Sequence, residues 1–515
     1  MRFFKKTSPR RNQVRKNITA VRFLQISRFA NTDSLISALL WLLFVGLCVL
    51  ILSFKLTQQG RYRDLIPITI LVVLISLAAA FYIHHYQKRI IENHIRALAL
   101  VGLFILLLAT TKFAVLSTRH TLWATGSAVT VAIILTIAYD QRFAIEMSIF
   151  YCLLACFAAG ELRTNQEYQL TNINLFLTMS AGVITCCFSL GEIRTRMKLL
   201  TVNSLAAIIV FITAGTLASL DFLDNKLLLH HVFSNAGYHA GAALGVGLLI
   251  QSLLPLIEKT FRIATSMTLL DYSDANQPLL KRLAMEAPGT FSHSLLVGSV
   301  AEGAAEAINC NGLLCRVGAY YHDIGKINKP GYFVENEIGS TSRHIELSPA
   351  MSQLIIVGHV KDGIEMAKEY GLPAVLRQFI ETHHGTTLVE YFFSEAKKKT
   401  DEKQSPPSES EFRYVGPKPR TKEAAIVMLA DTAEGAVRSM PAELTPTKIE
   451  TAVHNIAMKR LQDGQFDECE LSLRELSQIE TSISKTLAAH HHARVAYPKA
   501  PDEPEDTQSR PKKNN

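Results

Sequence analysis

Eight apolar stretches follow one another through the first half of the chain, separated by short polar segments. They lie at about 36–56, 65–86, 97–117, 122–139, 144–160, 172–191, 202–220 and 239–257. A helix of about 20 apolar residues crosses a hydrocarbon layer, and most of the stretches reach that length. The pattern therefore predicts a polytopic transmembrane helix bundle of about eight spans over 35–257. The stretches 122–139 and 144–160 are shorter and nearly continuous, so a re-entrant pair is an alternative there.

From about residue 262 the pattern changes to charged residues at helical spacing, interrupted by glycine and proline. The alternation typical of strands is scarce, so the second half is predicted to be all-α. A linker helix region is expected over 258–292 and a helical domain over 293–495. Residues 394–420 are polar and proline-rich, which predicts a long loop. The composition of 496–515 predicts a disordered tail.

The net charge of +8 is carried by the N-terminal arm, residues 1–34. This arm holds nine Lys or Arg residues against Asp33, and the rest of the chain is neutral. A nucleic-acid-binding protein places its basic residues across a folded domain, so no nucleic acid polymer is expected as a partner. The loops on the side of the arm are the more basic ones, which predicts both chain ends in the cytoplasm and the arm beside anionic membrane lipid. Trp41 and Trp123 each lie near the start of an apolar stretch, as interfacial tryptophans do.

The composition excludes several classes of protein. Hydrophobic residues make up 48% of the chain and charged residues 19%, unlike collagen, coiled coils or disordered chains. The mean hydropathy of +0.17 is then the average of a membrane bundle and a polar domain. Eight cysteines include no second pair beside Cys310 and Cys315, so buried thiols are expected rather than a zinc knuckle.

Histidines and carboxylates form an ordered series in the second half. The residues are His293, His322, Asp323, His359, His383, His384 and Asp431. Each of them alone is best interpreted as a core or surface residue, but the ordered set indicates metal ligands. Imidazole with carboxylate suits iron, manganese or zinc, and seven ligands exceed the four that one tetrahedral ion takes. They match two divalent metal ions sharing a bridging carboxylate. Neighbouring helical residues point about 100° apart, which suits His322 as a terminal ligand and Asp323 as the bridge.

Several strings around these residues resemble one family, the bacterial seven-transmembrane HD family (PgpH-type) of cyclic di-AMP phosphodiesterases. The resemblance covers about half of the chain closely and the membrane bundle more loosely. The strings include LLKRLAMEAPGTFSHSLLVG (279–298), RVGAYYHDIGKINKP (316–330), LIIVGHVKDG (354–363), IETHHGTTLVEYF (380–392) and FRYVGPKPRTKEAAIVMLADTAEGAVRS (412–439). It implies that 293–495 is an HD metal phosphohydrolase domain.

The resemblance also implies a role for each site residue. The first metal ion would take His293, His322 and Asp431, the second would take His359, His383 and His384, and Asp323 would bridge them. His322, Asp323 and Lys326 would be catalytic, with Lys326 in contact with phosphate. Iron or manganese is the implied metal. Two residues of the predicted loop, Arg413 and Tyr414, are candidate substrate contacts beside Lys326, and a solvated loop is the alternative. His344 is expected either to support a ligand from behind or to be structural.

The implied function is that of a membrane-anchored enzyme that hydrolyses cyclic di-AMP to 5′-pApA. A metal-bridging hydroxide would attack phosphorus. The implied location is the bacterial inner membrane, with the HD domain in the cytoplasm. One feature departs from the family, in which a large extracellular domain usually follows the first span. Here about residues 57–64 separate the first two apolar stretches, so the usual sensor domain is missing at this point.

Other functions stay open on the residues alone, since the ligand chemistry supports no more than a phosphate ester hydrolase. Cyclic di-GMP and guanosine tetraphosphate are alternative substrates, although no Gly-Tyr-Pro string follows His383 and His384. A receptor that binds a nucleotide without cleaving it is a further alternative. A transporter is disfavoured, because the apolar stretches carry few charges and no paired helix breaks. A homodimer is an open assembly state.

Overall fold

The computed structural model describes residues 35–60, 62–87, 94–118, 120–160, 168–191, 195–220, 228–261, 263–337, 342–399, 406–440 and 445–492. These residues form helices, and among them the β contacts are limited to one isolated bridge between Leu388 and Arg413. The all-α prediction is confirmed. The predicted arm 1–34 and tail 496–515 lie outside the described residues.

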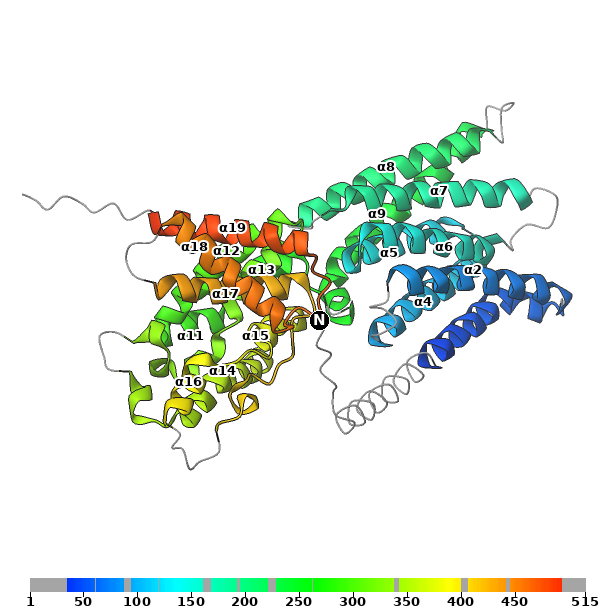
Figure 1. The fold of residues 1–515 in the computed structure, drawn as a ribbon. Coiled ribbons are helices and arrows are strands. Elements are labelled where there is room, and N and C mark those ends of the chain that lie inside the picture. The colour runs from blue at the N-terminus through cyan, green and yellow to red at the C-terminus, as the bar shows by residue number, and fades with distance from the viewer. Residues whose placement is uncertain are drawn as a thin grey trace, which may run out of the picture. The chain divides into compact units, whose positions relative to one another are not determined.

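The chain divides into two compact units, with the boundary between Thr268 and Leu269 (Figure 1). This boundary falls inside the linker predicted over 258–292. The finer domain limits stay predictions. Each unit is described by itself below.

The first unit is a set of apolar helices. They are Leu35–Gln58, α2 (Leu65–Tyr86), α4 (His94–Thr118), α5 (Leu122–Ala138), α6 (Gln141–Ala159), α7 (Tyr168–Ser189), α8 (Arg196–Leu220) and α9 (Leu228–Phe261), with a short 3-10 turn η1 (Tyr62–Asp64). Six of them are long and apolar enough to cross a membrane, while α5 and the described apolar part of α7 are shorter. The chain is therefore a multi-pass membrane protein with about eight apolar helices, as predicted.

Helix α5 lies inside this unit. Eleven of its 17 residues are buried, from Ala124 to Leu135. It packs against α4, α6, α7 and α9, so its apolar surface contacts protein rather than lipid. Whether α5 and α6 form a re-entrant pair stays a prediction.

The second unit is built from shorter helices around its own core. They are α10 (Ser266–Tyr272), which crosses the unit boundary, α11 (Pro278–Glu286), α12 (Pro288–Ala307), α13 (Gly312–Tyr321), α14 (Pro349–Glu369), α15 (Ala374–Thr382), α16 (Glu390–Lys399), α17 (Lys422–Arg438), α18 (Pro446–Gln462) and α19 (Leu473–His492), with the 3-10 turn η3 (Ile324–Asn328). Helix α12 packs against α13, α17 and α19. Buried alanines such as Ala301 and Ala425 let these helices approach closely.

The prediction that a loop begins at residue 394 is wrong for its first residues. Helix α16 continues to Lys399, because the string EAKKK consists of good helix formers. Three lysines in its last turn also interact favourably with the helix C-terminus. A second piece, η7 (Glu409–Phe412), interrupts the rest of the predicted loop.

Candidate metal centre

The seven predicted ligands come from five places in the second unit and meet at one point. His293 lies in α12, His359 in α14 and Asp431 in α17. His322 caps the C-terminus of α13 and Asp323 the N-terminus of η3. The last two ligands, His383 and His384, follow α15 directly. Helix ends and helix interiors thus contribute together, which gives each side chain a fixed backbone position.

Two glycines permit this convergence. A Cβ atom on Gly325 would lie 1.9 Å from the backbone oxygen of His359, so η3 can approach α14 only because this residue is glycine. A Cβ on Gly318 would lie 2.4 Å from the ring of Phe379, which permits the same close approach between α13 and α15. The sequence string HDIGK therefore contains two ligands, His322 and Asp323, and the glycine, Gly325, that lets α14 approach them.

The ligand atoms fall into two groups that share Asp323. One group is His293, His322, Asp323 and Asp431, and the other is Asp323, His359, His383 and His384. Within each group the candidate ligand atoms all lie within 4.8 Å of one another. The structure thus brings together every residue predicted as a ligand, in the two sets that the family resemblance implies.

In the first group, His293 Nε2 lies 3.0 Å from Asp431 Oδ1 and 3.7 Å from Asp323 Oδ2. His322 Nε2 lies 3.2 Å from the same Asp323 oxygen and 3.5 Å from Asp431 Oδ1. The two imidazoles and two carboxylates therefore surround one small volume.

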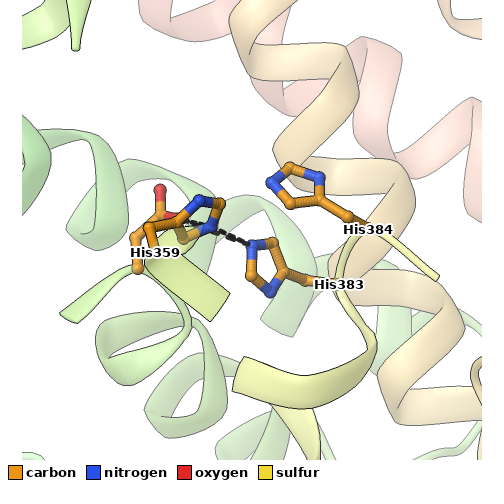
Figure 2. Close-up of side chains that lie close together, drawn as sticks. His359, His383 and His384 are labelled. Atoms are coloured by element: carbon orange, nitrogen blue, oxygen red, sulfur yellow. Dashed lines mark hydrogen bonds and ion pairs between the residues drawn. The ribbon is translucent and has the colours of Figure 1, made fainter. Parts of the chain in front are cut away.

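The other oxygen of Asp323 belongs to the second group. Asp323 Oδ1 lies 3.3 Å from His359 Nε2 and 3.5 Å from His383 Nε2, and these two nitrogens lie 3.2 Å apart. The ring of His384 lies 4.0 Å from that of His383 between centroids. Figure 2 shows the three labelled histidines clustered together, with His359 and His383 joined by a dashed line. One oxygen of Asp323 for each group is the geometry of a bridging carboxylate.

Hydrogen bonds on the far side of the rings fix their tautomers. The Nδ1 atoms lie near backbone oxygens one turn earlier: His322 at 2.6 Å from Ala319, His359 at 2.5 Å from Ile356, and His383 at 3.0 Å from Phe379. A carbonyl oxygen only accepts, so each Nδ1–H donates and each Nε2 faces the centre, where it offers a lone pair to a metal ion once it carries no proton. His293 is held in the same way, because its Nδ1 lies 2.5 Å from Glu434 Oε2. This arrangement is typical of metal-binding histidines.

A cation fits the atoms that face this centre. Among the described residues, His322 Nε2 and Asp323 Oδ1 are buried and have no hydrogen-bond partner. Buried acceptors that face one another are costly unless a positive charge satisfies them. Burial alone would lower the pKa of His322, but Asp323 and Asp431 raise it to about 10, so the centre favours positive charge. The donor set is compatible with divalent metal ions.

Two of the ligands, Asp323 and His384, are in the protonation states that metal binding needs, whereas His322 releases a proton when a metal ion binds. Burial would raise the pKa of the Asp323 carboxyl, but His322 and Lys326 outweigh it and hold that pKa well below its usual range. Burial, with His383 and His359 nearby, lowers the pKa of His384 well below its usual range. At neutral pH Asp323 is therefore ionised and His384 neutral, as metal ligands must be.

Comparison with known proteins identifies the family. Residues 62–265 match the family described as "7TM receptor with intracellular HD hydrolase", and residues 290–435, which contain all seven predicted ligands, match the HD domain. The chain belongs to this family of seven-transmembrane HD proteins. The resemblance drawn from the sequence strings is confirmed.

Two similar proteins are named cyclic-di-AMP phosphodiesterase PgpH. The protein from Bacillus subtilis is 38% identical over 377 residues, which cover 72% of this chain and 50% of the relative. That from Listeria monocytogenes is 35% identical over 365 residues, covering 71% and 49%. The chain thus spans about half the length of these relatives. The crystal structure of the L. monocytogenes PgpH HD domain in complex with cyclic-di-AMP is 43% identical, covers 42% of this chain and 99% of that chain, and gives a TM-score of 0.40.

The three residues predicted to contact substrate lie in different surroundings. Lys326 Nζ lies 2.7 Å from Asp323 Oδ2 and 2.7 Å from Glu335 Oε1, at the edge of the first group. Tyr414 stacks on His384 with ring centroids 4.2 Å apart, which places it at the second group. Arg413 is held in a two-pronged ion pair with Asp463, at 3.0 and 3.1 Å. Their roles toward a substrate stay predictions.

Three supporting residues escaped the sequence analysis. Glu434 orients His293 and could have been found, because it lies three residues after Asp431 on the same helix. Glu335 holds Lys326 and accepts a hydrogen bond from Thr290 Oγ1.

Gln465 is the third. Its Oε1 accepts a hydrogen bond from the backbone N–H of Thr386, two residues after His384. Neither Glu335 nor Gln465 lies at a distance in the sequence from a predicted ligand that would indicate its supporting role. His344 lies in neither ligand group; its Nε2 is 2.8 Å from the backbone oxygen of Tyr332.

Proposed function

We propose that the chain is a membrane-anchored, metal-dependent phosphodiesterase that hydrolyses cyclic di-AMP to 5′-pApA. The observation that carries the proposal is the sharing of Asp323, which offers one oxygen to each of two ligand groups. Hydrolysis of phosphate esters is the chemistry that paired metal sites of this kind support. The names of the B. subtilis and L. monocytogenes relatives support the choice of substrate.

Some residues of the site would hold the metal ions, and others orient the ligands or a bound phosphate. Two divalent cations, when bound, would polarise the phosphoryl oxygens and lower the pKa of water. Asp323 joins the two groups, and the Nδ1–H contacts keep the imidazoles of His322, His359 and His383 aimed at the centre. Lys326 keeps a positive charge beside Asp323, because both Asp323 and Glu335 raise the pKa of its ammonium group despite burial. That charge is placed to stabilise negative charge on a bound phosphate.

Iron or manganese is the proposed metal. Five imidazoles and two carboxylates suit these ions, and no thiolate is present in either group of described residues. Metal analysis of the full chain, purified without oxygen, tests this: about two iron or manganese ions per chain are expected. Zinc at that stoichiometry would contradict the assignment.

The proposed location is the bacterial inner membrane, with the N-terminus and the HD domain in the cytoplasm. The basic loops support this orientation. A phosphatase reporter that is active only outside the cytoplasm, fused after residue 515, should give no signal. Fusions in the loop after Leu35–Gln58 should be active. The reverse pattern would overturn the orientation.

The activity test uses the full chain in detergent with Mn²⁺ or Fe²⁺. Cyclic di-AMP, cyclic di-GMP and guanosine tetraphosphate are supplied separately, and the products are identified by chromatography. Cyclic di-AMP is expected to turn over fastest and to yield 5′-pApA. Faster hydrolysis of cyclic di-GMP would reject the substrate, and binding of nucleotide without any hydrolysis would favour a receptor. The Asp323→Ala variant controls for contaminating hydrolases.

A further inference from the structure

The membrane unit contains a cavity that the hydrolase site does not use. It has a volume of about 440 Å³ and lies between Leu35–Gln58, α2, α4 and α6. Ligand pockets measure roughly 300–1,000 Å³, so the cavity can hold a small molecule. Most of its wall is apolar, including Phe44, Ile75, Leu100, Phe104 and Leu154.

The cavity is elongated along the helices. On α2 its wall extends from Ile75 to His84, and on α4 from Ala97 to Phe104. At 1.5 Å per residue these distances are about 13 Å and about 10 Å. An extended hydrocarbon chain has this shape, whereas a compact ligand would leave one end of the wall uncovered.

The two ends of the cavity differ in polarity. Ser37 and Trp41 lie at the start of the first helix, His84 near the end of α2 and Ala97 near the start of α4, so all four mark one end. The indole Nε1 of Trp41 is buried there, and no described residue accepts its hydrogen bond.

The opposite end is formed by Phe44, Phe104 and Ile75, with Ser76, whose hydroxyl donates to the backbone oxygen of Val73. A polar end at an interfacial tryptophan and an apolar end deeper in the bundle match an amphiphile.

We propose that this cavity binds one acyl chain of a membrane phospholipid, with the headgroup at the end marked by Trp41 and His84. The outer face of α2 exposes large apolar side chains, Leu74, Leu77 and Phe81, so lipid surrounds the helix that forms one wall. The buried N–H of Trp41 can donate to an ester or phosphate oxygen of the lipid.

The test uses tryptophan fluorescence, because the chain has two tryptophans. Trp123→Phe leaves Trp41 as the sole indole in the full chain. Phosphatidylglycerol with brominated acyl chains is then added to the protein in detergent, where bromine quenches a tryptophan that it contacts. Quenching that saturates near one lipid per chain is expected.

Variants of two neighbouring alanines of α2 distinguish binding in the cavity from binding at the outer, lipid-facing surface. Ala79 lines the cavity and Ala78 is exposed on another face. In the Trp123→Phe background, Ala79→Phe should abolish the saturable quenching, while Ala78→Phe should leave it unchanged. Ala97→Phe fills the cavity independently from α4 and decides the matter if Ala79→Phe does not fold.

Two results would overturn the proposal. One is quenching that rises without saturation in the Trp123→Phe protein, which would indicate detergent-like lipid contact only. The other is saturable quenching that survives in the folded cavity-filling variants as fully as in Ala78→Phe. Size-exclusion chromatography and the thermal melting of each variant establish which of them are folded.

Discussion

Both units of the molecule bury histidines, but they surround them differently. In the membrane unit, His239 of α9 is buried between two hydroxyls. Its Nδ1 lies 2.7 Å from Thr125 Oγ1 and its Nε2 lies 3.4 Å from Thr121 Oγ1. In the HD unit, the Nε2 of His322 faces carboxylate oxygens of Asp323 and Asp431 instead. A hydroxyl both donates and accepts, whereas a carboxylate only accepts.

The difference separates a structural histidine from a ligand. Hydroxyls complete the hydrogen bonds of His239 in either tautomer, so that cluster needs nothing from outside. In the metal centre, imidazole nitrogens face carboxylate oxygens, and both are groups that accept. The centre therefore requires added positive charge. The same contrast holds for Thr111, whose hydroxyl donates to Ser127 Oγ in the membrane unit. Removing charge or metal should therefore damage one unit and leave the other intact.

The largest expected effect comes from Asp323→Asn. The amide keeps the size of the side chain but loses the charge and one acceptor, so it cannot bridge the two groups. The rate of cyclic di-AMP hydrolysis should fall by at least roughly 10³-fold, more than the 10–100-fold typical of residues that only orient a ligand. Glu365→Gln on the exposed face of α14 is the matched control and should leave the rate unchanged. A rate for Asp323→Asn close to that of the unmodified chain would remove Asp323 from the centre.

Removal of the metal should destabilise the HD unit alone. A ligand present at 100 times its Kd stabilises the folded state by about 2.7 kcal/mol, and a chelator removes this contribution. Hydrogen exchange measured by mass spectrometry should then increase in α12 and α17 but not in α5. Equal changes in both units, or no change in either, would contradict the comparison. The Asp323→Asn variant should respond less to the chelator than the unmodified chain.

The sequence reveals the ligands better than it reveals their supports. His322 and Asp323 are chemically distinctive and stand in an ordered series, so their convergence was predictable. Arg413 was predicted to contact substrate because it is basic and lies in a polar loop. Its ion pair with Asp463 joins residues 50 positions apart, and only the packing of the helices creates it. Similarly, the length of α5 was visible, but its burial depends on four neighbouring helices.

Glu434 offers a smaller test of how the ligands are oriented. Glu434→Gln weakens the acceptor that holds His293 Nδ1–H, so metal affinity should fall by about 10–100-fold. Chelator competition measures this. Arg438→Gln is the control, because Arg438 pairs with the other oxygen of Glu434 at 3.5 Å and is partly exposed; an exposed pair contributes little. If both variants lose affinity equally, Glu434 does not act through His293.

The smallest expected effect is that of Tyr151→Phe in the membrane unit. Tyr151 is fully buried and its hydroxyl lies 3.3 Å from Thr111 Oγ1. Its loss leaves the bond from Thr111 to Ser127 intact, because Thr111 donates to Ser127 and Ser127 donates in turn to the backbone oxygen of Ala124. Side-chain hydrogen bonds in membranes contribute about 0.6 kcal/mol on average, so unfolding in detergent should shift by about that amount, with metal affinity unchanged. A loss of stability as large as that caused by the chelator would contradict the comparison, because the membrane hydroxyls would then matter as much as the metal centre.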